Sequence, residues 1–216
     1  MTKKNNDPRE TLNEIRSLME RSSRFISLSG LSGVAAGLWA LLGAAAVYLY
    51  LDVSPFDQRR IYYQQALEAE KWGVDYITFF LLDGSIVLAM AIASGIVFTT
   101  RKARQKGQRI WDALTRRLLA SLALPLAAGG LFCLALFYHG YLGLIAPATL
   151  VFYGLALINA GKYTLDDVRY LGIAEVVLGL LALFLLGYGL EFWAIGFGLL
   201  HIIYGALMYF KYERAG

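Results

Sequence analysis

Three ionisable side chains lie inside long apolar runs, where such residues are rare. They are Asp83 in "FFLLDGSIVL", Glu175 in "YLGIAEVVLGL" and His201 in "FGLLHIIYGAL". An ionised side chain at the centre of a membrane helix costs roughly 2.5–3.5 kcal/mol on insertion scales, so each is a functional candidate. Carboxyl and imidazole groups exchange protons, and the expected depths of the three are staggered across a membrane. The chemistry that they indicate is the transfer of protons or the binding of a small solute.

A relay through these three groups alone would have long gaps at a rise of about 1.5 Å per helical residue. Three polar side chains on other spans could fill the gaps if the fold turns them inward: Tyr153, Asn159 and Tyr204. The alternative for each candidate is structural. Asp83 and Glu175 would then be protonated or hydrogen-bonded carboxyls, and His201 would be a neutral imidazole with two hydrogen bonds.

The residue types that are scarce exclude several classes of site. The chain has two histidines, expected at different depths, and the single cysteine Cys133, so a multi-histidine, cysteine-cluster or disulfide-based site is excluded. It also lacks the HExxH, GxSxG, P-loop and GxGxxG motifs. We therefore expect no metal site and no cofactor, and an enzyme would have to build its site from Asp83, Glu175 and His201.

The elements that must position the candidates are membrane helices. The chain has 216 residues, of which 58% are apolar, against about 45–50% in soluble domains. A helix of roughly 20 apolar residues crosses a bilayer. Six segments in a domain at 25–210 qualify: 25–51, 76–98, 118–138, 141–160, 170–188 and 192–210. Because the third and fourth spans, and the fifth and sixth, are joined by very short connections, we predict an all-α polytopic bundle of three helical hairpins.

The basic residues predict the orientation of this bundle. Of the 20 lysines and arginines, all but Arg59, Arg60 and Lys71 lie on one side of the predicted spans. Since cytoplasmic segments carry the excess of positive charge, the N-terminal segment 1–24 and the tail 211–216 are predicted to be cytoplasmic. The net charge of +4 reflects this asymmetry, and no nucleic acid is expected as a partner.

Two cytoplasmic segments are candidates for contacts outside the bundle. Asp7, Pro8 and Glu10 form a helix-capping pattern, and apolar residues follow on one face. We predict an amphipathic helix in the segment 1–24 that lies on the membrane surface. Its residues 7–22 could instead bind a protein partner, as could the basic loop 101–117, for which anionic lipid is the simpler expectation.

Small residues predict a close helix contact on the first span. Ser29, Gly33 and Gly37 recur every fourth residue, a spacing that lets a second helix approach closely. That helix can belong to the same chain or to a second copy in a homo-oligomer. The similar stretches "GLWAL", "GLFCL" and "GLLAL" also indicate an internal repeat of helical hairpins, one in each outward-going span.

Three longer stretches resemble those of small six-span bacterial inner-membrane proteins that have no assigned activity. They are "ETLNEIRSLMERSSRFISLSGLSG", "RKARQKGQRIWDALTRRLL" and "IAPATLVFYGLALINAGKYTLDD". The resemblance implies the same fold and the bacterial inner membrane, and it transfers no catalytic residue. Two functions remain as hypotheses. The first is a non-enzymatic scaffold, sensor or partner subunit. The alternative is a small channel or transporter for protons or a small solute that uses Asp83, Glu175 and His201.

Overall fold

The computed structural model describes residues 28–55, 70–107 and 110–214. The predicted amphipathic helix at 1–24, including the partner-binding stretch 7–22, lies outside the described residues. The regular structure of these residues is helical apart from an antiparallel ribbon of two short strands, β1 (Glu70–Lys71) and β2 (Val74–Asp75). The turn between them places Trp72 and Gly73 at positive φ. The prediction of an all-α protein is therefore confirmed for the described residues.

Within these residues, five helical units are long and apolar enough to cross a membrane. They are α2 (Gly30–Leu51), α4 (Tyr76–Gln105), α5 (Ala113–Tyr138), the unit of η1 (Leu142–Leu144), α6 (Ile145–Ala160) and η2 (Gly161–Tyr163), and the unit of α8 (Gly189–Trp193), η3 (Ala194–Leu200) and α9 (His201–Tyr212). The remaining helix is α7 (Asp166–Phe184). It carries the four charged residues Asp166, Asp167, Arg169 and Glu175.

The predicted basic loop 101–117 is helical at both ends. Helix α4 continues to Gln105, and α5 begins at Ala113, where the side chain of Asp112 accepts a hydrogen bond from the Thr115 N–H. This contact satisfies one of the free N–H groups at the helix start. Part of the positive charge of the predicted loop therefore belongs to helix ends, and Lys102 is buried.

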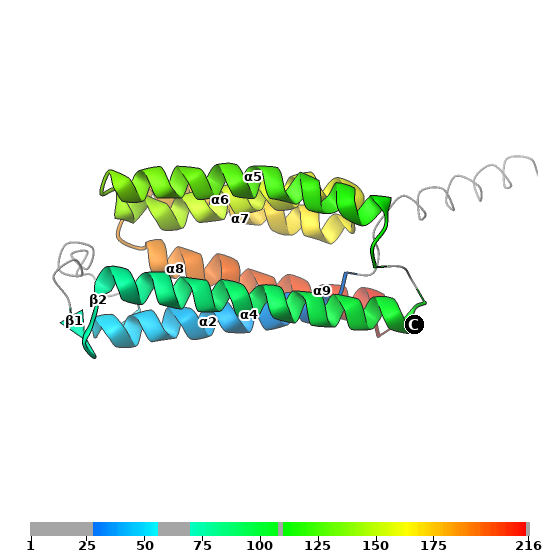
Figure 1. Ribbon diagram of the computed structural model, residues 1–216, viewed down its shortest axis with the longest axis horizontal. Helices are drawn as coiled ribbons and strands as arrows, with labels where there is room; N and C mark the ends of the chain where they lie inside the picture. Colours follow the sequence, from blue (N-terminus) through cyan, green and yellow to red (C-terminus); the bar gives the residue numbers. More distant parts are fainter. Residues whose placement is uncertain (1–27, 56–69, 108–109, 215–216) are drawn as a thin grey trace, which may run out of the picture.

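The helices form two layers (Figure 1). One layer contains α5, α6 and α7, and the other contains α2, α4 and the α8–η3–α9 unit. The most extensive packing lies within these layers, between α6 and α7, α5 and α6, α2 and α4, and α2 and α9. Contacts between the layers are fewer. The few residues that form them therefore hold the two layers together.

The last helix of the chain packs away from its neighbour in sequence. Helix α7 packs mainly on α6, whereas α9 packs mainly on α2 at the start of the described chain. A tight hairpin of the last two spans would have placed α9 on α7. Figure 1 also shows that the first described residues and the end of α9 lie at the same end of the bundle.

Glycines allow the closest helix approaches in both layers. A Cβ atom on Gly33 would lie 3.2 Å from the Gly205 Cα, and one on Gly37 would lie 2.6 Å from the Gly198 carbonyl oxygen. In the other layer, a Cβ on Gly154 would lie 2.6 Å from the Gly172 carbonyl oxygen. The small residues of the first span therefore face α9 and η3 of the same chain.

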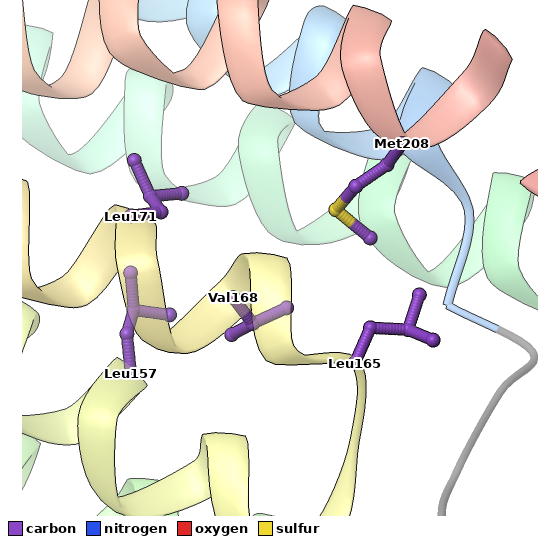
Figure 2. Close-up of a cluster of buried hydrophobic side chains, with 5 residues drawn as sticks. All are labelled: Leu157, Leu165, Val168, Leu171 and Met208. Carbon is purple, nitrogen blue, oxygen red and sulfur yellow. The ribbon is translucent and has the colours of Figure 1, made fainter. Parts of the chain in front are cut away.

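One apolar cluster joins the two layers near the ends of α6 and α9 (Figure 2). Figure 2 shows Met208 of α9 pointing toward Leu165 and Val168, next to Leu157 and Leu171. All five side chains are buried. By contrast, many leucines and isoleucines on the outer faces of α4 and α5 are exposed, as is usual where the surrounding solvent is hydrocarbon.

An ion pair between the buried Lys102 and the partly buried Glu213 connects three helix ends at this end of the bundle. Glu213, just after α9, accepts hydrogen bonds from the Gly30 N–H at 2.5 Å and from the Ser29 hydroxyl at 3.2 Å, and it pairs with Lys102 of α4 at 3.3 Å. A carboxylate at a helix start is favourable because it satisfies free N–H groups and the helix dipole. The pair thus fixes the positions of α2, α4 and α9 together.

Truncating this carboxylate should weaken the bundle. We expect Glu213→Ala to lower the free energy of unfolding by about 2 kcal/mol, within the range for hydrogen bonds to charged groups, because Lys102 and the start of α2 lose their partner. Denaturant titration in detergent micelles measures this. The matched control is Asp52→Asn, which breaks the exposed pair with Lys71, suits the left-handed backbone at this position and should cost less than about 1 kcal/mol. Equal losses in the two variants would contradict the prediction.

Candidate functional site

His201 lies in a buried polar cluster between the two layers. Its side chain is 5% exposed, and its two ring nitrogens have different partners. Nδ1 lies 3.0 Å from the Gly196 carbonyl oxygen, and Nε2 lies 2.8 Å from the hydroxyl of Tyr153 on α6. Because a carbonyl oxygen only accepts, Nδ1 must carry a proton. In the neutral imidazole, Nε2 then accepts a hydrogen bond from the Tyr153 hydroxyl.

Glu175 of α7 adds a carboxyl group to this cluster. It is 0% exposed, and its Oε1 lies 3.4 Å from His201 Nδ1. Within the described residues, neither carboxyl oxygen has a hydrogen-bond partner. A buried carboxyl without hydrogen bonds is costly in either protonation state. Such a group in a folded protein calls for an explanation, and a role in proton chemistry is one of the few available.

A π-helical stretch with small residues makes room for the carboxyl. Residues Ala194–Leu200 form the π-helical segment η3, and His201 follows it directly. Within it, a Cβ atom on Gly196 would lie 2.5 Å from Glu175 Oε2 and 2.5 Å from Leu150 Cδ2. A Cβ atom at this position would therefore force the ends of the Glu175 and Leu150 side chains to move. Single π-helical turns often mark functional sites in helices.

The cluster connects helices of different layers. Tyr153 and Glu175 belong to α6 and α7 in one layer, and His201 and Gly196 belong to the α8–η3–α9 unit in the other. A second polar contact between layers lies at the chain end, where Asp167 of α7 accepts hydrogen bonds from Lys211 and Tyr212 of α9. That second contact is more exposed, with Lys211 at 57%.

The pair of Glu175 and His201 can hold one proton in two ways. The proton can lie on the imidazole, which gives an ion pair, or on the carboxyl, which gives two neutral groups. Both forms have no net charge. Gaining a further proton or losing this one leaves an uncompensated charge in a buried site, which is strongly unfavourable. The attraction between the layers therefore depends on how many protons the pair holds.

Asp83 lies apart from this cluster. It is half-buried on α4 and faces α2 at Gly43, where an added Cβ would lie 3.2 Å from Asp83 Oδ2. It also lines a cavity of about 300 Å³ between the layers, whose lining includes neither Glu175 nor His201. The structure therefore brings two of the three candidates together and places the third at a separate position.

Of the three side chains that the sequence offered as bridging groups, one contacts His201 and two lie elsewhere. Tyr153 contacts His201, as a bridging group would. Asn159 instead donates a hydrogen bond to the Ser121 carbonyl on α5, and Tyr204 packs against the apolar cluster of Figure 2. Gly196 was not considered from the sequence, because a glycine in an apolar run carries no sign that a carboxylate lies against it.

In the parts of the chain that the structure describes, no three His, Cys, Asp or Glu side chains gather as a metal site would require. Comparisons with protein-family models, with curated proteins and with solved structures find no match for this chain. The function therefore has to be argued from the residues and their geometry alone.

Proposed function

We propose that this protein is a non-enzymatic sensor or partner subunit of the bacterial inner membrane, with six spans and both termini in the cytoplasm. Its two helical layers respond to protonation of the Glu175–His201 pair. The lysine and arginine distribution supports the orientation, and α7 is the sixth span in this proposal. Protein partners would be contacted through 7–22 or through the basic segment 101–117.

One observation carries the proposal. Glu175 is fully buried, has no hydrogen-bond partner among the described residues, and lies 3.4 Å from His201 Nδ1 on the opposite layer. Helices of different layers make fewer contacts with each other than helices of the same layer do. A change in the charge of this pair therefore acts on a sparse interface. Tyr153 is the ionisable group that reaches the pair from a third helix.

The cavity at Asp83 supports a second candidate function. A transporter needs a space between two helical groups that can move against each other, and this cavity lies between the same two layers. The cavity favours the alternative of a small channel or transporter. We rank this function second because the lining of the cavity at Asp83 includes neither Glu175 nor His201.

Infrared difference spectroscopy tests whether Glu175 exchanges a proton. We expect the difference between about pH 5 and about pH 8, the range in which histidine ordinarily titrates, to contain a carbonyl band of a protonated carboxyl in the reconstituted protein. Glu175→Gln should lose that band, while Asp83→Asn should keep it. The same spectrum in wild type and Glu175→Gln would overturn the proposal.

Distances between the layers test the consequence of that exchange. Spin labels at Ile96 of α4 and Leu131 of α5, both exposed, report on opposite layers when Cys133 is replaced by alanine. We expect the distance distribution to change between the two pH values in wild type and to stay constant in Glu175→Gln. Asp167→Asn, which alters the other polar contact between layers, should keep the change. A change that persists in Glu175→Gln would contradict the proposal.

A further inference from the structure

The cavity beside Asp83 combines an apolar wall with a single carboxylate. It lies between α2, α4 and α8 of one layer and α5 and α6 of the other. Among the described residues that line it, Asp83 is the one carboxylate, and none is a lysine, arginine or histidine. Asp83 has neither a hydrogen bond nor an ion pair within the described residues. The cavity therefore has one carboxyl group and no cationic side chain in its described wall.

The remaining wall suits a cation that has an apolar body. Aromatic rings from both layers line the cavity, among them Phe80, Phe137 and Trp193. The faces of such rings attract organic cations, and quaternary ammonium groups are commonly recognised in this way. Leucine, isoleucine, valine and alanine side chains form most of the rest, so an apolar substituent can be buried against them.

The cavity suits an organic cation better than a metal ion. Hard cations such as Ca²⁺ take six to eight oxygen ligands, and Mg²⁺ demands about six in octahedral geometry. Here Thr149 is the one hydroxyl-bearing threonine or serine in the described lining, and its hydroxyl already donates to the Ala146 carbonyl. The volume of about 300 Å³ lies at the lower end of the range for small-molecule sites.

We propose that this cavity binds a small lipophilic organic cation, with the Asp83 carboxylate as its counter-ion. The charged nitrogen lies next to Asp83, and the apolar part lies between the aromatic and aliphatic side chains of the two layers. The volume corresponds to about ten water-sized groups, so the ligand is a small amine or ammonium ion. This inference does not rest on the protonation of Glu175 and stands or falls separately from the proposed function.

Two probes of the same shape test the role of the charge. Benzyltrimethylammonium is the cation, and neopentylbenzene is its uncharged carbon isostere. Binding to the full chain in non-ionic detergent micelles is measured by calorimetry and by quenching of tryptophan fluorescence. We expect the cation to bind roughly tenfold or more tightly than the isostere, a ratio that reflects the charge because the shapes are equal. Equal affinity for the two probes, or no binding of the cation, would overturn the proposal.

Three variants assign the binding to this cavity. Asp83→Asn keeps the shape and should weaken cation binding by roughly tenfold or more, with binding of the isostere unchanged. Asp112→Asn removes one negative charge outside the cavity and keeps a helix-capping side chain, so it should bind like wild type. Ala146→Phe fills the cavity and should abolish binding of both probes.

Folding of each variant is checked by circular dichroism and by elution volume. Should Ala146→Phe fail to fold, the comparison of Asp83→Asn with Asp112→Asn still decides the question, because neither changes a side-chain volume appreciably. Cation binding that is equal in Asp83→Asn and wild type would show partition into the detergent or binding elsewhere. That result would overturn the proposal.

Discussion

Replacing Gly205 by alanine is expected to lower the free energy of unfolding by about 3 kcal/mol, the upper end of the usual cost of overpacking. A Cβ atom at this position would lie 2.6 Å from the Val34 nitrogen, 2.7 Å from the Gly30 carbonyl oxygen and 3.0 Å from the Gly33 carbonyl carbon. All three are backbone atoms of α2, so no side chain can rotate to relieve the contact. Helices α2 and α9 must move apart.

Unfolding by denaturant in mixed micelles measures this loss, and α4 supplies a matched control. Gly95 is also a glycine inside a helix, but a Cβ atom there would meet nothing within 4 Å among the described residues. Gly95→Ala should therefore leave stability unchanged or raise it slightly, since alanine favours a helix by about 1 kcal/mol over glycine. A loss in Gly205→Ala no larger than in Gly95→Ala would show that α2 and α9 are not in close contact.

The second large effect is expected at His201. We expect His201→Leu to cost about 3–5 kcal/mol of unfolding free energy, the usual cost of removing one member of a buried pair. The change deprives the Tyr153 hydroxyl of its acceptor and leaves Glu175 buried without the nearby imidazole. His139→Leu is the matched control, because His139 is exposed in the turn after α5, and it should change stability by less than about 0.5 kcal/mol.

A double-mutant cycle separates the pair from the general loss of a buried side chain. Because replacing both members of a buried polar pair by apolar groups is often nearly neutral, the variant with both Glu175→Leu and His201→Leu should lose less than the sum of its single changes. We expect a coupling energy of about 1–3 kcal/mol. Single losses that simply add in the double variant would mean that Glu175 and His201 do not interact in the folded protein.

The sequence alone determined the helical membrane character of the chain. Apolar runs of the length that a bilayer requires predicted helices, and five of them have the length and composition to cross a membrane. The helix boundaries were less certain at 101–117, because basic residues there suggested a loop. Those residues are good helix formers, and α4 continues through them until Gln105.

The sequence also singled out Glu175 and His201, since an ionisable side chain in an apolar run is conspicuous in any arrangement of the helices. It could not show that the two lie together while Asp83 lies at a separate cavity. The membrane helices here are apolar around most of their circumference, so no periodic pattern indicates which face is buried. Glycines in the sequence likewise predict that a second helix packs closely against the first, but they do not identify that second helix.

Only the tertiary structure shows which helices pack together and which polar side chains contact each other. Packing of α9 on α2, and of α7 on α6, places His201 opposite Glu175 and Tyr153 at the junction of the layers. In hydrocarbon, helices associate through close backbone contact and hydrogen bonds rather than through burial of apolar surface. Those contacts depend on matching shapes at particular glycines, such as Gly205 and Gly196, and shape complementarity between distant segments is a property of the folded chain.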